Sequence, residues 1–171
     1  GHFTLFLRQD TEYWVNAGHG LSIVVFSVVC FLSVIDRYGH ACADWALKKT
    51  VEICQTIGRK NDIFSRLGGE EFCLLLTSCD KQAALQHAEA CRAAIEAIDT
   101  TESGFDFTIT ASFGITDTAT SNYDLDKLMA DADSSAYAAK HAGRNQVKIF
   151  EKPIKPKKVK TIHLDDTRNT F

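Results

Sequence analysis

Hydrophobic and polar residues along the chain follow the spacings of strands and helices in turn. Residues 21–29 are mostly apolar without alternation, which is typical of a central strand that helices cover on both faces. Over 43–57, apolar residues recur three or four positions apart, and this spacing predicts a helix that ends at Gly58. Two short apolar runs at 63–67 and 72–76 then predict a pair of strands.

The second half of the chain continues with helix, strand, helix and strand. Asp80 can cap a helix whose apolar residues have helical spacing. Strict alternation over 107–113 predicts a strand that pairs near the preceding hairpin. Asp124 can cap a last helix that ends at Gly143, and 146–150 reads as a short final strand. This order of elements predicts an α+β fold, with a central, mostly antiparallel sheet flanked by helices.

The residues that join the paired strands are Gly68, Gly69, Glu70 and Glu71. A Gly-Gly pair between β-type runs is a hairpin signal, and both glycines can take positive φ. Because they have no Cβ, a ligand can reach the main-chain N–H groups, and the two glutamates place carboxylates beside that opening. These residues alone leave two interpretations open, a metal-bound phosphate site and a solvated hairpin tip.

Size and composition limit the domain organisation and the partners. The chain has 171 residues, 45% of them hydrophobic, which is enough for one core. We expect an N-terminal segment over 1–20, one domain over 21–150, and a tail over 151–171 that holds both prolines and several lysines. A net charge of −3 gives no electrostatic basis for nucleic-acid binding. The six cysteines form no CxxC pair, which predicts reduced thiols and fits the cytoplasm.

The longest stretch without a formal charge covers residues 17–35, nineteen residues in all. This length requires a membrane span to be considered. Its dense part, 21–35, is rich in Val, Ile and Phe, and suits a buried strand that continues into a helical segment. No secretory signal is visible, and we expect no membrane span in this chain.

The residues around the hairpin resemble a known family. Residues 66–72, Arg-Leu-Gly-Gly-Glu-Glu-Phe, are similar to the signature of GGDEF domains, the diguanylate cyclase domains of bacterial signalling, in its GGEEF form. Further segments match at the expected places, namely 38–40 with Asp44, 59–62 and 139–145. The resemblance covers roughly residues 21–150 and implies a fold related to nucleotide cyclases and polymerase palm domains.

The resemblance also implies an activity. The family condenses two GTP molecules into cyclic di-GMP and two pyrophosphates; each domain of a homodimer holds one GTP, and Mg²⁺ or Mn²⁺ neutralises charge. By resemblance, Glu70 and Glu71 are catalytic and bind the metal together with the main chain of Val28. The matching substrate-binding positions are Gly68, Gly69, Asp44, Lys140 and Arg144. We also expect the domain to be fused to, or regulated by, a sensor or effector domain.

The same resemblance exposes departures from the family pattern D-x-D-x-F-K-x-x-N-D-x-x-G-H. Ser27 and Val29 stand where the family has two aspartates. Leu32 replaces the lysine, and Ile35 replaces the asparagine that reads the guanine edge. A carboxylate about 4 Å from a cation contributes about 4 kcal/mol at an effective dielectric near 20, so serine at position 27 weakens metal binding by roughly a thousandfold. We therefore predict impaired cyclase chemistry.

Arg59 and Asp62 match the RxxD inhibitory site of the family, where an arginine binds cyclic di-GMP through bidentate hydrogen bonds. Without the resemblance, the same pattern is an ordinary exposed ion pair. A second arginine that often completes this site from the following helix corresponds to Ala90 here. The pattern predicts a site that is weakened or needs another chain.

Three functions remain open. The favoured one is a degenerate domain that binds cyclic di-GMP or GTP and acts as a sensor or regulatory module. The second is an active diguanylate cyclase with a relaxed metal and guanine site, which the intact residues 68–72 favour. The third is a dimerisation module that holds no nucleotide.

Overall fold

The structure is a computed structural model, and it describes residues 12–13, 20–28 and 31–152. Most of the predicted N-terminal segment and of the tail lies outside the described residues, as does Val29. The side chain of Leu32 lies outside them too.

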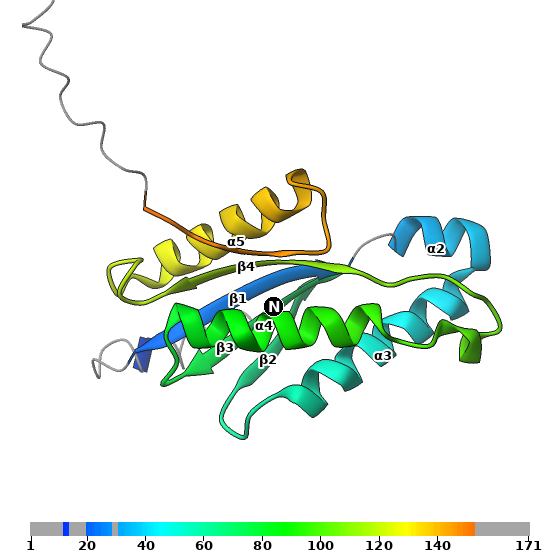
Figure 1. The fold of residues 1–171 in the computed structure, drawn as a ribbon, viewed down its shortest axis with the longest axis horizontal. Helices are drawn as coiled ribbons and strands as arrows, with labels where there is room; N and C mark the ends of the chain where they lie inside the picture. The colour runs from blue at the N-terminus through cyan, green and yellow to red at the C-terminus, as the bar shows by residue number, and fades with distance from the viewer. Residues whose placement is uncertain (1–11, 14–19, 29–30, 153–171) are drawn as a thin grey trace, which may run out of the picture.

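A five-stranded sheet forms the centre of the molecule (Figure 1). Its strands, in chain order, are β1 (Leu21–Val28), β2 (Ile63–Gly68), β3 (Glu71–Thr77), β4 (Ala111–Asp117) and β5 (Val147–Ile149). Across the sheet the order is β2-β3-β1-β4-β5, and only the pairing of β4 with β5 is parallel. The predicted α+β fold with a mostly antiparallel sheet is confirmed.

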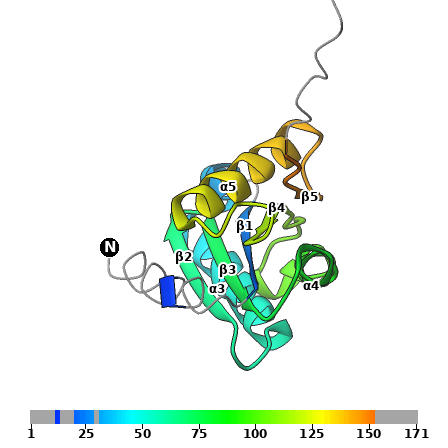
Figure 2. The ribbon, with the colours of Figure 1, turned by 90° about the vertical axis from the view of Figure 1, so that its left-hand side faces the viewer.

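Helices cover both faces of this sheet. They are α2 (Phe31–Tyr38), α3 (His40–Ile57), α4 (Lys81–Glu96) and α5 (Leu125–His141), with a short 3-10 turn, η1 (Thr100–Ser103). The helices α3 and α4 lie on one face and α5 on the other (Figures 1 and 2). In the part of the chain that the structure describes, no helix is long and apolar enough to cross a membrane.

Alternation along β1 explains why both faces are apolar. Val24, Phe26 and Val28 face the core under α3 and α4, whereas Ile23 and Val25 face α5. The ring of Phe26 forms the centre of the larger core: its centroid lies 5.2 Å from that of Phe72 and 4.6 Å from that of Phe113. The continuous apolar run of β1 therefore reflects a strand that is buried on both sides.

Local signals place the two long helices after the hairpin. The Asp80 side chain accepts a hydrogen bond from the N–H of Ala83 at 2.9 Å, and that of Asp124 accepts one from Lys127 at 3.3 Å. Both predicted caps are confirmed. Gly114 lets α5 approach β4 closely, because a Cβ there would overlap main-chain atoms of the helix.

Two predicted boundaries are wrong. The helix α3 begins at His40, three residues before Ala43, because Gly39 takes φ +92° and turns the chain between α2 and α3. The strand β4 covers 111–117 instead of 107–113. The hydroxyl of Thr100 donates to the carbonyl of Phe107 and accepts from its N–H, so these main-chain groups bond a side chain and not a neighbouring strand.

Two further expectations about the hairpin also need correction. The strand β4 pairs with β1 and β5, and β1 separates it from the hairpin. Neither Gly68 nor Gly69 takes positive φ. The register shifts between Arg66 and Gly68, so an irregularity at the end of β2 turns the chain there.

Candidate functional site

The C-terminal end of β1 meets the hairpin at one edge of the molecule. Ser27 pairs in register with Glu71 of β3 on one side and with Ser112 of β4 on the other. The N–H of Val28 donates to the carbonyl of Glu70 at 3.0 Å. The predicted site residues of two segments that are distant in sequence are thus adjacent.

The hairpin turn is open to a ligand. The guanidinium of Arg66 crosses the turn, and its Nε donates to the carbonyl of Gly69 at 3.0 Å. Gly68 and Gly69 are exposed, and a Cβ added to either would meet no atom within 4 Å. The main chain of the turn is therefore accessible, although it does not have the positive φ values that the glycine pair suggested.

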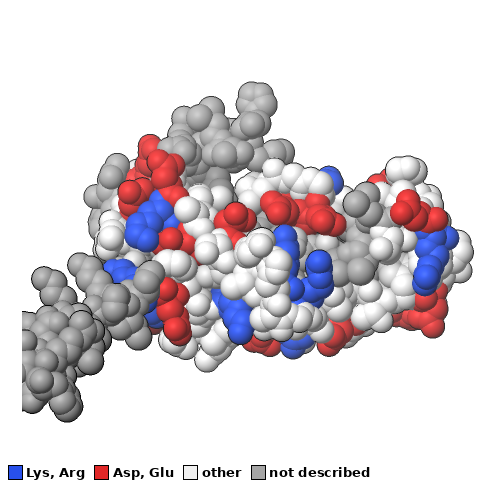
Figure 3. Space-filling model, turned by 90° about the horizontal axis from the view of Figure 1, so that it is seen from above, with Lys and Arg blue, Asp and Glu red and all other residues white. Residues whose placement is uncertain are grey.

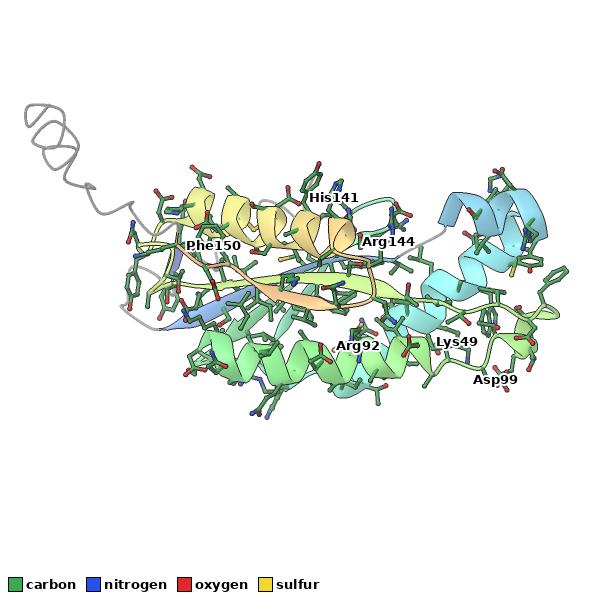
Figure 4. All side chains as sticks on the ribbon, turned by 45° about the horizontal axis from the view of Figure 1, so that its top comes forward. Lys49, Arg92, Asp99, His141, Arg144 and Phe150 are labelled. Atoms are coloured by element: carbon green, nitrogen blue, oxygen red, sulfur yellow. The ribbon has the colours of Figure 1, made fainter. Side chains whose placement is uncertain are left out.

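Two basic residues lie at the end of α5, and one of them contacts the hairpin. Lys140 Nζ lies 3.7 Å from Glu71 Oε1, and both side chains are partly exposed. Arg144 is exposed just after α5 (Figure 4), and its N–H donates to the carbonyl of Ala139 at 3.0 Å. Lys140 and the hairpin carboxylate thus share one surface, where a phosphate could contact the lysine.

A network that the sequence did not reveal fixes the loop after α5. The N–H of Asn145 donates to Ser112 Oγ at 3.1 Å, and Arg92 Nη1 of α4 donates to Asn145 Oδ1 at 3.0 Å. Asn145 also donates to the carboxylate of Glu96. These contacts join residues that are far apart in sequence, so only the neighbouring Gly143, as a helix stop, hinted at an ordered loop.

The residues present do not make a self-contained metal site. Ser27 is 4% exposed and brings no charge to the end of β1. Glu71 already faces the ammonium group of Lys140. Among the described residues, no group of three or more His, Cys, Asp and Glu is placed to hold a cation. Since Mg²⁺ and Mn²⁺ prefer oxygen ligands, the two glutamates and the main chain of Val28 are the donors that remain.

A cavity of about 380 Å³ lies between the first helices and the hairpin. Its lining residues are Ile35, His40, Ala43, Asp44, Leu47, Arg66, Gly69 and Glu70. Asp44 can accept hydrogen bonds from a base edge, whereas Ile35 can offer only an apolar contact. A neighbouring cavity of about 610 Å³ shares Asp44, Leu47 and Arg66 with it. Asp44 therefore remains available to a polar base edge, in a pocket that His40, Arg66 and Glu70 also line with polar groups.

Arg59 and Asp62 form a second, separate group after α3. Arg59 Nη2 donates to Asp62 Oδ1 and to the carbonyl of Thr77, both at 2.8 Å. The hydrogen bond to Asp62 raises the pKa of Arg59, so the guanidinium stays charged. Its side chain is 46% exposed, whereas that of Asp62 is 3% exposed. One edge of the guanidinium is held in place while its other side faces solvent.

The two groups lie at opposite ends of β3. Glu71 is the first residue of this strand, and Thr77, which holds Arg59, is the last. At 3.3 Å per residue the strand separates them by roughly 20 Å. Ala90, the position of the second arginine in the family pattern, is exposed on α4 and adds no charge.

Comparison with known proteins identifies the domain. Residues 1–146 match the family described as "Diguanylate cyclase, GGDEF domain". Diguanylate cyclase A of Treponema denticola is 30% identical over 155 residues, which cover 86% of this chain and 41% of that protein. Diguanylate cyclase VdcA of Vibrio cholerae is 32% identical over 136 residues, 78% of this chain and 40% of that protein. The chain thus spans about two fifths of these relatives.

Solved structures share the fold. The GGDEF domain of YfiN from Pseudomonas aeruginosa is 26% identical, with a TM-score of 0.76 over 84% of this chain and 90% of that one. The GGDEF domain of DgcB from Caulobacter crescentus, solved in complex with c-di-GMP, has a TM-score of 0.80 at 22% identity, over 88% of this chain and 89% of that one. With its hairpin signature at the edge of this sheet, the chain belongs to the GGDEF family, the diguanylate cyclase-like domains of cyclic di-GMP signalling.

Proposed function

We propose that this domain binds guanine nucleotides with impaired cyclase chemistry and acts as a sensor or regulatory module. The observation that carries the proposal is Ser27. It occupies a buried position between Glu71 and Ser112, at the end of β1 where the family pattern has an aspartate. Without that carboxylate, Mg²⁺ or Mn²⁺ binds weakly and GTP turnover is slow.

Cyclic di-GMP is the proposed ligand of Arg59 and Asp62. The fixed guanidinium of Arg59 can donate to a guanine edge or a phosphate with its exposed side, and Asp62 keeps it oriented. Because Ala90 supplies no second arginine, tight binding of cyclic di-GMP requires a cation from another copy of the chain. The proposed state is therefore a homodimer.

GTP is the proposed ligand of the hairpin. The open turn at Gly68 and Gly69, with Lys140 beside Glu71, supports contacts to the phosphates, and Arg144 is proposed as a further contact. Asp44 supports partial recognition of guanine in the adjacent cavity. Loss of one hydrogen bond to the base, at the position of Ile35, costs about 1–3 kcal/mol of binding energy.

Calorimetry with cyclic di-GMP tests the sensor function. The wild type is expected to bind, and Arg59→Ala is expected to lower the affinity at least tenfold, which is about 1.4 kcal/mol. Arg37→Ala is a charge-matched control, because Arg37 is exposed on α2, and it should leave the affinity unchanged. A wild type that does not bind would overturn the sensor function.

A second candidate is an active cyclase, which the intact hairpin favours. Incubation with GTP and either Mg²⁺ or Mn²⁺, followed by chromatography, measures the product. Efficient turnover by the wild type that Glu70→Ala abolishes would replace our proposal. A thermal unfolding temperature that does not respond to GTP, GDP or cyclic di-GMP would instead favour a dimerisation module without nucleotide.

A further inference from the structure

Three consecutive residues after α5 have a left-handed main chain, and we call them the 143–145 loop. Gly143, Arg144 and Asn145 take φ values of +119°, +65° and +47°. Glycine adopts this conformation freely and asparagine tolerates it, but arginine adopts it less readily. A strained conformation of this kind persists only where the surrounding structure holds it in place. The contacts of the loop therefore decide where Arg144 lies.

Two main-chain groups of the loop are held by neighbouring elements. The N–H of Arg144 donates to the carbonyl of Ala139 at 3.0 Å, which closes the last turn of α5. The N–H of Asn145 donates at 3.1 Å to the hydroxyl of Ser112, which is buried on β4. The loop is thus joined to α5 at its start and to the sheet at its end.

The side chain of Asn145 joins the loop to α4 as well. Its Oδ1 accepts a hydrogen bond from Arg92 Nη1 at 3.0 Å, and its amide nitrogen donates to the carboxylate of Glu96. The reverse orientation of the amide would place its NH₂ group against a guanidinium, so only one orientation satisfies both contacts. Arg92 Nε also donates to Glu89 Oε2 at 3.1 Å, and the Arg92 side chain is 20% exposed. Arg92 is therefore fixed on α4, at the same end of the domain as Arg144 (Figure 4).

A row of three residues lies on the face of the sheet that α5 covers. Ser27 pairs in register with Glu71 on one side and with Ser112 on the other, and directly paired residues share a face. Val25 and Cys73 pack in the core under α5, and each is two residues away from a member of the row. Alternation along the strands therefore places Ser27, Glu71 and Ser112 on the α5 side.

The end of α5 spans this row. Lys140 Nζ lies 3.7 Å from Glu71 Oε1 at one end of the row, and the N–H of Asn145 bonds Ser112 at the other end. Arg144 lies between Lys140 and Asn145 in the chain and is exposed. Neighbouring strands are about 4.8 Å apart, so the row is roughly 10 Å wide and a long side chain can cross most of it. Arg144 can contact an anion at the end of β1 as long as the loop keeps its main chain in place.

We propose that Arg92 is a positioning residue for an anionic ligand at this edge. Through Asn145 it fixes the left-handed 143–145 loop, and the loop holds Arg144 where its guanidinium can contact the phosphates of GTP. Arg92 does not itself contact the ligand, because Glu89 and Asn145 already occupy its guanidinium. The inference rests on the proposed binding of GTP at the hairpin and adds a residue of α4 to that site.

Hydrogen exchange of the Asn145 amide tests the link from Arg92 to the loop, and it needs no nucleotide. Arg92→Lys keeps a positive charge beside Glu89, but lysine lacks the planar fork that bonds Glu89 and Asn145 together. In the folded full chain, this amide is expected to exchange roughly tenfold faster in Arg92→Lys than in wild type. Arg37→Lys, at an exposed position of α2, is the matched control and should leave the rate unchanged. Equal rates in Arg92→Lys and wild type would overturn the inference.

Calorimetry with GTP and Mg²⁺ on a double-mutant cycle tests the link from the loop to the ligand. Arg144→Met removes the proposed contact and should lower GTP affinity roughly tenfold, whereas Arg92→Lys should lower it about fivefold. The double variant should bind no more weakly than Arg144→Met alone, because a positioning residue has no effect once the residue that it positions is gone. Losses that multiply in the double variant would mean that Arg92 acts independently of Arg144, which would contradict the proposed role.

A second variant applies if Arg92→Lys lowers the stability of α4. Asn145→Gly removes the side-chain link to Arg92, while glycine adopts φ +47° without strain. It should speed exchange in the loop and lower GTP affinity as Arg92→Lys does, with α4 unchanged. In the Asn145→Gly background, Arg92→Lys should have no further effect on either measurement. A further loss there would show that Arg92 does not act through Asn145.

The two measurements distinguish this inference from the proposed function. A wild type that binds GTP, with unchanged affinity in Arg92→Lys, would keep the GTP site and overturn the role of Arg92. A wild type that does not bind GTP, with faster exchange in Arg92→Lys, would overturn the GTP site and the effect on the ligand, and would support the hold of Arg92 on the loop.

Discussion

Lys140 Nζ lies 3.7 Å from Glu71 Oε1, which connects the last turn of α5 to the first residue of β3. Both side chains are partly exposed, so water and salt screen their attraction and the pair stabilises the fold by about 0–1 kcal/mol. A basic group at this position has a stronger effect on an anionic ligand than on the fold. Acidic and basic residues are interspersed over the α5 side of the molecule (Figure 3), so neither sign of charge dominates that face.

Substitution of Lys140 separates binding from stability. Lys140→Met is expected to change the free energy of unfolding by less than about 1 kcal/mol. It should lower GTP affinity roughly tenfold, because a charge-assisted contact to phosphate contributes about 1.5–3 kcal/mol. Urea unfolding and calorimetry measure the two effects. Lys60→Met, an exposed lysine in the loop after α3, is the control; an equal loss of affinity in both variants would contradict a specific contact.

A carboxylate at position 27 should recreate part of a cation site. Ser27→Asp is expected to destabilise the protein by about 1–3 kcal/mol, because the new charge is buried without a partner. Mn²⁺ should restore the unfolding temperature by binding between the new aspartate and Glu71, which pairs with position 27. Thermal unfolding with and without Mn²⁺ measures this.

The control for that experiment lies on the neighbouring hairpin strand β2. Ser65 is 4% exposed, as Ser27 is, so Ser65→Asp has a similar desolvation penalty. It lies opposite Cys73 and not opposite a hairpin glutamate. Rescue of both variants by Mn²⁺, or of neither, would show that the edge near Ser27 is no cation site.

Gly114 is a position where the packing of α5 on β4 allows no side chain. In Gly114→Ala, the new Cβ would overlap main-chain atoms of Ala132, Ser135 and Ala136. We expect a loss of about 3 kcal/mol in the free energy of unfolding, since main-chain atoms of a helix cannot move aside independently. Gly20→Ala meets no atom within 4 Å and should change it little. Equal urea midpoints for the two variants would contradict this packing.

Asp117 should make stability depend on pH. Burial raises its pKa, but hydrogen bonds from Thr120 and from the N–H of Lys81 outweigh that effect and lower it. Because the pKa is lower in the folded than in the unfolded protein, this stabilisation is present above the unfolded pKa and is lost as pH falls through the folded one. Asp117→Asn should cost about 1 kcal/mol at pH 7.

Urea unfolding at neutral and acidic pH measures this effect. The difference between wild type and Asp117→Asn is expected to shrink as the pH falls. Asp106→Asn, at an exposed aspartate, should show little difference at either pH. A gap between wild type and Asp117→Asn that stays constant with pH would mean that ionisation of Asp117 does not stabilise the fold.

Local signals in the sequence were sufficient to predict the helices and the strand whose signals lie within a few residues of one another. The caps at Asp80 and Asp124 and the apolar run of β1 act within a few residues, so α4, α5 and the central strand could be predicted. The position of β4 could not be predicted from alternation, because the hydroxyl of Thr100 bonds the main chain of Phe107. At Phe107, main-chain hydrogen bonds to the side chain of Thr100 take the place of hydrogen bonds to a neighbouring strand.

The candidate site likewise has one part that could be predicted from the sequence and another part that could not. The glycine pair and the two glutamates are contiguous, and their pattern was readable without a structure. The approach of Lys140 to Glu71 and the link between Arg92 and Asn145 join distant segments, and nothing in the local pattern encodes them. Such contacts follow from the order of the strands in the sheet, and that order could not be predicted from the local pattern of residues.

The strands at the two edges of the sheet affect how copies of the chain can associate. At one edge, β5 has only three residues, and the exposed Lys148 is at its centre. At the other edge, β2 is irregular between Arg66 and Gly68. Short, charged or distorted edges are poor templates for strand addition, so cross-β aggregation of the native domain is disfavoured. Pairing of two copies is therefore expected through helix and loop surfaces, without extension of the sheet.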